Sequence, residues 1–385
     1  MSVFSSRARE LEISGIRRMF EAAPPGTINL GLGEPDFSPP AAIQEALFDA
    51  IRKGYNHYGP SAGILPLRDA LAQRYRRWDG RTARESVVVT EGGTEALAAC
   101  ALTLYEVGDE VLVPNPGFVL YAPHARMAGA IPIPYPLDEA NGYQPDLEAL
   151  ESRITPRTRV LVVNSPSNPT GSVYAPRVVD RLVDLAREHD LTILSDEVYD
   201  EILYVPQGHR SFWGRYERVV VVNSFSKLFA MTGWRLGYLV APPAVAQQVN
   251  KVHYHLVACP STPVQMAALA GLSAPPRETA EMVREFRARR DLFLRGLKQV
   301  PGLRCVIPEG AFYAFPRIDW GLSPLEAAQA LLQRGLLCTP GDSFGSLGEG
   351  HLRMSFATSR ENLRRALRIL EEFGEERTSR GRAAP

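Results

Sequence analysis

Residues 219–240 read VVVVNSFSKLFAMTGWRLGYLV, and this stretch indicates how the chain folds. It holds two apolar runs, 219–222 and 236–240, on either side of a segment that contains Lys227. Runs of the same kind lie upstream, at 87–89, 111–113, 160–163 and 192–195. Such nearly continuous apolar runs are typical of strands that are covered on both faces of a sheet.

Helical patterns separate these runs, for example at 94–105 and 177–189. The alternation predicts an α/β fold with a mostly parallel central sheet and helices on both faces. The later elements that we predict are helix 278–299, strand 311–315, helix 324–334, strand 352–356 and helix 360–373, followed by a frayed polar tail. We therefore expect a large domain at 41–275, a smaller α+β domain at 276–385, and an N-terminal segment at 1–40 that belongs with the smaller domain.

The composition is that of a folded protein without an excess of charge. The 385 residues include 43 Lys+Arg and 43 Asp+Glu, and 45% of them are hydrophobic. This apolar content excludes disorder as the main state, and the zero net charge argues against binding to nucleic acid or to an anionic membrane. No apolar run approaches the roughly 20 residues that cross a bilayer, and the N-terminal stretch lacks the apolar core of a secretory signal.

The cysteines and lysines narrow the chemistry further. The four cysteines (100, 259, 305 and 338) are too widely spaced for a metal site, so we expect free thiols, no metal and a cytosolic location. Nearly all of the 43 basic residues are arginines, and the four lysines are Lys53, Lys227, Lys251 and Lys298. Any reaction that requires a primary amine has only these four positions, and Lys227 follows a strand, where open α/β sheets place ligands.

Residues around Lys227 suit a cofactor that carries a phosphate. Ser224 offers a hydroxyl, and Arg235 offers a planar fork that matches phosphate oxygens. Upstream, Gly93 and Thr94 open a helix directly after the strand at 87–89, and a helix N-terminus attracts anions. A strand-to-helix turn needs glycine in any case, so this second motif alone is weak.

Four more residues complete a set of complementary groups. Asp196 follows a strand, where its carboxylate could hold a ring nitrogen protonated or could simply cap a helix. Tyr199 and Asn168 could reach a ring oxygen, although Asn168 lies among turn-forming residues. Arg353 interrupts an apolar strand and needs an anionic partner, either a structural acid or a substrate carboxylate. Together these groups describe a pyridoxal 5′-phosphate site for an amino acid.

Motifs along nearly the whole chain resemble a known family. From about Leu11 to Phe373, the chain resembles the class I/II aminotransferases of the pyridoxal-phosphate fold type I superfamily. The matching blocks occur in the family's order: NLGLGEPDF, HYGPSAGILPLRDALA, GGTEAL, NPGFVLYAP, NSPSNPTG, SDEVY, SFSKLFAMTGWRLGY and LRMSFATS. The blocks SFSK…TGWRLGY and NSPSNPTG are highly specific, so the resemblance implies this fold and this activity.

The resemblance implies a role for each candidate residue. Lys227 would bond covalently to the cofactor and act as the catalytic base, Asp196 would pair with the pyridine nitrogen, and Tyr199 would bind the ring oxygen. The phosphate would be held by Gly93, Thr94, Ser224 and Arg235. Phe118 would stack on the ring, and Asn168 would assist at the ring oxygen.

Substrate and partner contacts follow from the same resemblance. Gly33, Asn168 and Arg353 would bind the α-carboxylate of an amino acid. Tyr58 would reach the phosphate in the neighbouring subunit, so the resemblance implies a homodimer with shared sites. Ser226 receives no role, because small residues vary at its place in the family.

We expect an aminotransferase that moves the amino group of a broad range of L-amino acids, aromatic or apolar ones above all, to 2-oxoglutarate by ping-pong chemistry. Relatives of the aspartate type often have lysine where this chain has Thr94, which weakens an aspartate-only interpretation. Arg17 or Arg18 could accommodate a second carboxylate or could be solvated, and Phe20 could add to an aromatic surround. Open alternatives are an aspartate or alanine aminotransferase, a β-lyase or cyclising synthase on the same frame, and the effector domain of a transcription regulator, for which too few residues precede NLGLGEPDF.

Overall fold

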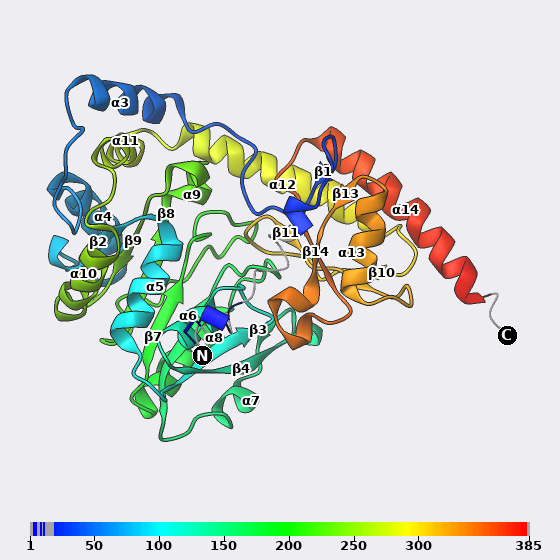
Figure 1. Ribbon diagram of the computed structural model, residues 1–385, viewed down its shortest axis with the longest axis horizontal. Coiled ribbons are helices and arrows are strands. Elements are labelled where there is room, and N and C mark those ends of the chain that lie inside the picture. Colours follow the sequence, from blue (N-terminus) through cyan, green and yellow to red (C-terminus); the bar gives the residue numbers. More distant parts are fainter. Residues whose placement is uncertain (1–2, 6–7, 10, 12–18, 383–385) are drawn as a thin grey trace.

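A sheet of eight strands forms the centre of the larger part of the protein (Figure 1). The computed structural model describes residues 3–5, 8–9, 11 and 19–382. The strands lie in the order β2-β9-β8-β7-β6-β3-β4-β5. Their bounds are β2 (Val87–Thr90), β3 (Glu110–Asn115), β4 (Ile131–Asp138), β5 (Gln144–Pro145), β6 (Thr158–Asn164), β7 (Thr192–Asp196), β8 (Val219–Ser224) and β9 (Gly237–Val240).

Most of these strands run in one direction. Strands β4, β3, β6, β7 and β8 pair in parallel with their neighbours, whereas β9 is antiparallel to both β8 and β2, and β5 is antiparallel to β4. The six strands predicted from apolar runs are all present within a few residues of their expected ends. The mostly parallel α/β fold is therefore confirmed.

Strand β4 was missed because its sequence, IPIPYPLD, contains three prolines. The prolines alternate with residues whose N–H groups point toward β3. Ile131, for example, donates its N–H to the carbonyl of Asp109, directly before β3, at 2.7 Å. Proline nitrogens at 132, 134 and 136 therefore face away from β3, where no ladder donor is lost. The strand tolerates its prolines because β5 pairs with β4 only at Leu137 and Asp138.

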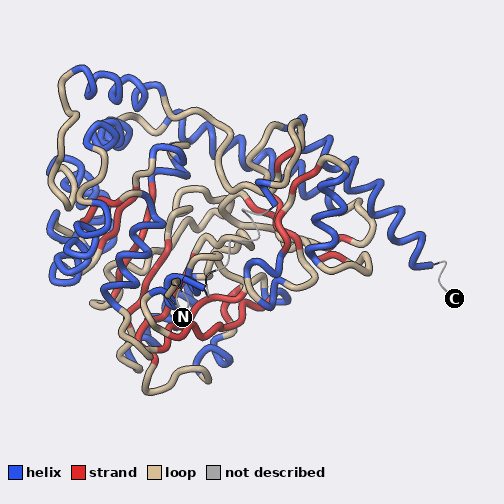
Figure 2. Tube along the Cα trace, viewed as in Figure 1, coloured by secondary structure: helices blue, strands red, loops and turns tan. Residues whose placement is uncertain are grey.

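Each strand alternates its side chains between two apolar cores. Val219 and Val221 of β8 pack into one core with residues of α4, α8 and α11, and Val220 and Val222 pack into the other with residues of α5, α6 and α10. Helices therefore cover both faces of the sheet (Figure 2). Their bounds are α3 (Ala41–Arg52), α4 (Leu65–Asp79), α5 (Gly92–Leu104), α6 (Tyr121–Met127), α7 (Leu147–Glu151), α8 (Pro176–Glu188), α9 (Phe225–Leu228), α10 (Pro243–Val257) and α11 (Thr262–Ser273).

A third core joins the C-terminal elements to the N-terminal segment. Strand β1 (Ile28–Asn29) pairs in parallel with β13 (Leu336–Leu337), and the Ser355 N–H donates to the carbonyl of Leu30 at 2.7 Å. The other elements here are α12 (Arg277–Leu297), β10 (Leu303–Arg304), β11 (Tyr313–Ala314), β12 (Arg317–Ile318), α13 (Pro324–Gln333), β14 (Thr339–Pro340), β15 (Leu352–Ser355) and α14 (Arg360–Arg382). The domain boundaries at residues 40 and 275 stay a prediction.

Helix α14 is longer than the sequence pattern indicated, and the expectation of a frayed tail after residue 373 was wrong. The helix continues to Arg382 because its added turns find partners. Glu376 pairs with Arg334 at 2.7 Å, and Thr378 donates to the carbonyl of Gly374 at 2.8 Å. Across the described residues, no helix is long and apolar enough to cross a membrane.

Candidate active site

A cavity of about 230 Å³ opens at the carboxyl ends of the central parallel strands. Asp196 ends β7, Ser224 ends β8, and Asn164 ends β6, so their side chains meet at one edge of the sheet. Eleven of the twelve residues predicted for the site line this cavity: Gly33, Gly93, Thr94, Phe118, Asn168, Asp196, Tyr199, Ser224, Lys227, Arg235 and Arg353.

Lys227 presents its amine to the cavity from the short helix α9. The Ser224 hydroxyl accepts from the Ser226 N–H at 3.0 Å, so Ser224 caps this helix. The Nζ atom of Lys227 donates to the carbonyl of Gly33 at 2.7 Å. Burial, and then the nearby positive charge of Arg353, lower the pKa of Lys227 to about 8. The amine is therefore neutral at a lower pH than an exposed lysine.

Asp196 is a buried carboxylate, only 4% exposed, with two fixed donors. Its Oδ2 accepts from the Tyr121 hydroxyl at 2.7 Å, and its Oδ1 accepts from the Val198 N–H at 3.3 Å. Burial raises the pKa of Asp196 to about 6, against the opposing effect of the Tyr121 hydrogen bond. The alternative in which Asp196 caps a helix is wrong, because a turn follows β7.

Asn164 was not singled out from the sequence, and it ties two predicted site residues together. Its Nδ2 donates to the carbonyl of Asp196 at 3.0 Å, and its Oδ1 accepts from the Asn168 N–H at 2.8 Å. Its position at the end of β6 matches the position of Asp196 at the end of β7. That shared position was the signal in the sequence that could have found it.

The first turn of α5 and Arg235 form a compact anion cradle. The backbone of Gly92 has φ +81, and a Cβ atom there would lie 2.7 Å from the Nη2 of Arg235. A Cβ at Gly237 would lie 2.6 Å from the carbonyl carbon of Gly92, so a second glycine is required behind the turn. Arg235 itself has φ +54 and donates to the carbonyl of Thr232 at 2.8 Å. Free N–H groups of the helix N-terminus and this guanidinium converge on one place.

Arg353 is 1% exposed, yet within the described part of the chain it has no carboxylate at ion-pair distance. Its Nη1 donates to the Oδ1 of Asn168 at 3.1 Å, and its Nη2 contacts the carbonyl of Gly31 and, at 3.4 Å, the hydroxyl of Thr339. Its Nε is buried and has no hydrogen-bond partner among the described residues. The interpretation as a structural ion pair is therefore wrong, and the buried cation is available to an anionic ligand.

Two tyrosines stand beside this cation. The hydroxyls of Tyr199 and Tyr313 lie 2.8 Å apart, and the guanidinium carbon of Arg353 lies 4.6 Å from the centre of the Tyr313 ring. Tyr313 lines the cavity but was not singled out from the sequence, because a tyrosine in the apolar run AFYAF is typical of a core residue. Tyr121 was missed for the same reason, since only the tertiary fold brings it to Asp196.

Tyr58 is the one of the twelve predicted site residues that does not line this cavity. Its side chain is 92% exposed, and it borders a separate open depression together with Glu91 and Ser261. Its predicted role across a subunit boundary stays a prediction. Arg17 and Arg18 lie outside the described residues, and Phe20 is 39% exposed and does not line the cavity.

The residues present fit pyridoxal phosphate. The cavity combines an amine whose pKa is lowered to about 8, a buried carboxylate for a ring nitrogen, and an anion cradle. The buried guanidinium of Arg353, which has no carboxylate at ion-pair distance among the described residues, adds a place for a carboxylate. Packing of a hydrophobic core does not by itself require these four polar features in one cavity.

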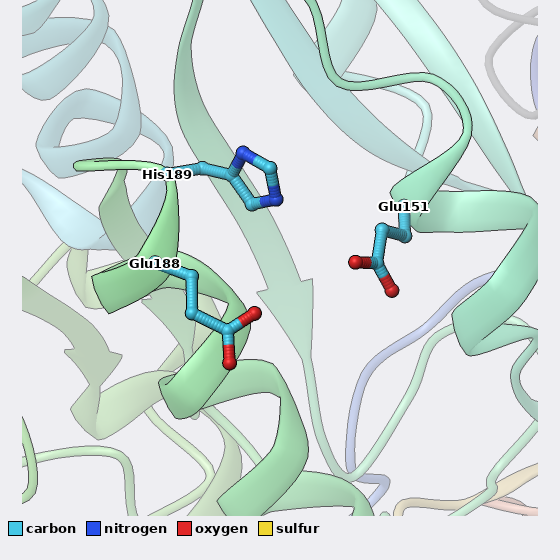
Figure 3. A group of neighbouring side chains, drawn as sticks. All are labelled: Glu151, Glu188 and His189. Carbon is cyan, nitrogen blue, oxygen red and sulfur yellow. The ribbon is translucent and has the colours of Figure 1, made fainter.

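A group of side chains elsewhere resembles a metal site but has another partner. Glu151, Glu188 and His189 are exposed, and their ligand atoms lie within 4.8 Å of one another (Figure 3). Arg181 already pairs with Glu188 at 2.9 Å and with Glu151 at 3.3 Å. The group is an exposed ion-pair cluster, and we assign no ion to it.

Comparison with known proteins shows the family of the chain. A family model described as aminotransferase class I and II matches residues 25–370. Aromatic-amino-acid aminotransferase 2 of Thermococcus litoralis is 39% identical, over 97% of this chain and 98% of its own. The aspartate aminotransferase of Pyrococcus horikoshii is 38% identical, over 96% of each chain. A solved structure of the Thermus thermophilus aspartate aminotransferase with maleate has a TM-score of 0.91 at 38% identity, and the match covers 97% of this chain and 100% of that one.

Fold, site and similarity together define a pyridoxal-phosphate-dependent transferase of fold type I. The chain belongs to the class I and II aminotransferases, because the family model spans most of its length and full-length relatives share more than a third of its residues. The resemblance stated from the motifs is thereby confirmed.

Proposed function

We propose that this enzyme binds pyridoxal 5′-phosphate in the cavity at Lys227 and transfers the amino group of aromatic or apolar L-amino acids to 2-oxoglutarate by ping-pong chemistry. The observation that carries the proposal is the meeting of Lys227, Asp196 and Arg353 around one cavity. Lys227 is an amine of lowered pKa, and Asp196 is a buried carboxylate. Arg353 is a buried guanidinium that has no carboxylate at ion-pair distance among the described residues.

When bound, the cofactor supplies an electron sink that weakens the Cα–H bond of the amino acid. Asp196 would pair with the ring nitrogen, and the donors Tyr121 and Val198 would hold the carboxylate in place. The cradle at Gly93, Thr94, Ser224 and Arg235 would bind the phosphate, Phe118 would pack against the ring, and Tyr199 with Asn168 would donate to the ring oxygen. The neutral Nζ of Lys227 would accept the Cα proton and then release it.

Arg353 and the backbone of Gly33 would orient the substrate through its α-carboxylate. The guanidinium lines the cavity, is held by Asn168 and lies on the Tyr313 ring, so it is in place before a substrate carboxylate binds. This contact exists for every amino acid, and it therefore sets no preference among side chains. Preference must come from the rest of the cavity wall.

The rest of that wall favours apolar side chains. Leu97, Phe118 and Val198 line the cavity, and its cations among the described residues are Lys227, Arg235 and Arg353, all of which have other roles. A second carboxylate would need a further cation from the partner subunit or from Arg17 and Arg18. The similarity to an aromatic-amino-acid aminotransferase supports the apolar choice. Several relatives are aspartate aminotransferases, so aspartate is the second candidate.

A homodimer with shared sites belongs to the same proposal. Tyr58 is almost fully exposed, and it borders a depression formed with residues 259–263 and Glu91. Tyr254 and Leu256 of α10 are also exposed large hydrophobic residues, as expected for a surface that another subunit covers. In the dimer, Tyr58 would reach the phosphate of the partner's site. The cytosolic location stays a prediction.

Comparing kcat/KM for phenylalanine, tyrosine, alanine and aspartate with 2-oxoglutarate tests this proposal, because specificity is defined by that ratio. We expect the aromatic amino acids to lead. An aspartate value above that for phenylalanine by more than about tenfold, roughly 1.4 kcal/mol, would contradict the apolar preference and favour aspartate. Pyruvate and ammonia formed without any 2-oxo acid would instead indicate a β-lyase.

A further inference from the structure

Tyr313 lines the cavity, and its hydroxyl has no role in the scheme above. It lies in β11, paired with Ser355 of β15, and is fully buried at the cavity wall. Its hydroxyl is 2.8 Å from that of Tyr199, and the two rings meet edge to face with centroids 5.8 Å apart. The pair links the smaller sheet to the end of β7.

The number of hydroxyl hydrogens decides which tyrosine donates in the hydrogen bond between Tyr313 and Tyr199. Each tyrosine hydroxyl carries one hydrogen, and from geometry alone either oxygen could be the donor of the pair. In the proposed function, Tyr199 donates its hydrogen to the ring oxygen of the cofactor. Tyr199 can then only accept from Tyr313, and the order of donation is Tyr313 to Tyr199 to the ring oxygen.

The rest of the Tyr313 side chain is also engaged. Its ring packs against Arg353, the cation that would bind the substrate carboxylate in the proposed function. The guanidinium carbon of Arg353 lies 4.6 Å from the centre of the Tyr313 ring. A Cβ atom at Gly33 would lie 2.1 Å from the Tyr313 hydroxyl oxygen, so the hydroxyl is held closely from the other side. Gly33 is in turn the residue whose carbonyl accepts from Lys227.

We infer that Tyr313 is a positioning residue for the transamination site: its hydroxyl donates to Tyr199 and strengthens it as a donor, and its ring supports Arg353. This inference rests on the proposed function. Hydrogen bonds in a chain polarise one another, so removal of the first donor weakens the second. The two parts of the side chain therefore have separable effects, the hydroxyl on the cofactor and the ring on the substrate carboxylate.

The hydroxyl part predicts a spectroscopic shift. A donor at the ring oxygen stabilises negative charge there, so weaker donation lets the bound group take up its proton at a higher pH. In Tyr313→Phe, the midpoint pH of the absorbance change of the bound cofactor should rise, by less than in Tyr199→Phe. Because Tyr313 acts through Tyr199, adding Tyr313→Phe to Tyr199→Phe should move the midpoint no further.

The ring part predicts a split between two substitutions. Tyr313→Phe keeps the ring, so the KM for the amino acid should stay within about twofold of the unchanged enzyme. Tyr313→Leu removes the ring under Arg353 and should raise that KM several-fold more than Tyr313→Phe does. A merely structural role would not separate the two readouts in this way.

The experiment is a pH titration of absorbance on purified enzyme loaded with pyridoxal 5′-phosphate, for the four members of the cycle. Tyr204→Phe is the control, since it removes another buried hydroxyl, one that donates to the carbonyl of Ala311 outside the cavity. An unchanged midpoint in Tyr313→Phe would overturn the inference. An equal shift when Tyr313→Phe is added to Tyr199→Phe, or a shift of the same size in Tyr204→Phe, would overturn it as well. Failure of the unchanged protein to develop a cofactor absorbance would instead refute the proposed function.

Discussion

The Nζ atom of Lys227 lies 2.7 Å from the carbonyl oxygen of Gly33, across 194 positions of the chain. This contact joins α9, which follows β8 directly, to the N-terminal segment that pairs with β13. The lysine amine is thereby aimed into the cavity, away from bulk water and beside the cation Arg353. Burial in the cavity and the positive charge of Arg353 on β15 together lower the pKa of this amine.

That ionisation can be measured in protein freed of cofactor. Burial and Arg353 lower the pKa of Lys227 to about 8, so its amine should become reactive toward an acylating reagent with a midpoint near that pH. An exposed lysine requires a pH near 10.4 for the same change. Peptide-resolved acylation rates measure the midpoint for each lysine, with Lys251 as an internal reference. A Lys227 midpoint equal to that of Lys251 would contradict the predicted shift, and Arg353→Gln should move the Lys227 midpoint upward.

Asp196 should be essential for turnover rather than for folding. Asp196→Asn cannot stabilise a positive charge on a ring nitrogen, and loss of such a contact raises a barrier by on the order of 2–4 kcal/mol, about 10²–10³ in rate. Steady-state kcat with phenylalanine measures this, and a thermal melt shows whether the fold is kept. Near-normal turnover in this variant would exclude the pairing role.

Tyr121→Phe should change how Asp196 titrates. The Tyr121 hydrogen bond lowers a pKa that burial raises to about 6, so its removal raises that pKa further. The carboxylate form is then lost at a higher pH, and the acid limb of kcat/KM should move upward. Tyr135→Phe is the matched control, because its buried hydroxyl donates to the carbonyl of Val162 instead. Equal profiles for the two variants would argue that Tyr121 does not tune Asp196.

A shared dimeric site can be tested by mixing two inactive variants. Tyr58→Ala and Lys227→Ala damage different subunits of the same proposed site, so one of the two sites in a mixed dimer carries both intact residues. Activity should reappear after subunit exchange, provided that Tyr58→Ala alone is strongly impaired. Absence of recovery, once mass spectrometry has confirmed the mixed dimer, would place Tyr58 outside the site.

Gly33 should accept no side chain. A Cβ atom there would lie 2.1 Å from the Tyr313 hydroxyl oxygen and 3.0 Å from its ring carbon Cζ. Gly33→Ala should therefore displace Tyr313 and raise the KM for the amino acid. Combining it with Tyr313→Phe removes the closest atom and should restore part of the loss. If the double variant is as impaired as the product of the single effects, the clash is not the cause.

The sequence predicted most of the site because the site follows the strands. Asp196, Ser224 and Lys227 stand directly after apolar runs, and the carboxyl ends of parallel strands meet at one edge of a sheet. Arg353 was recognisable as a cation inside an apolar strand, which needs an anion. Chemistry and spacing together were sufficient for these residues.

Residues whose role depends on tertiary packing could not be found in this way. Tyr121 and Tyr313 look like core aromatics in the sequence, and only the fold brings their hydroxyls to Asp196 and Tyr199. Strand β4 was hidden by its prolines, which are harmless because their nitrogens face away from β3. The direction of a side chain decided the two tyrosines, and the direction of the backbone nitrogens decided β4.

The most direct test of the whole account is to trap the cofactor on the protein. Borohydride reduces the bond between an amine and the aldehyde of pyridoxal phosphate, and peptide mapping then locates the label. We predict a yellow protein that carries the label on Lys227 alone among the four lysines. A label on Lys53, Lys251 or Lys298, or a protein that takes up no cofactor, would contradict it.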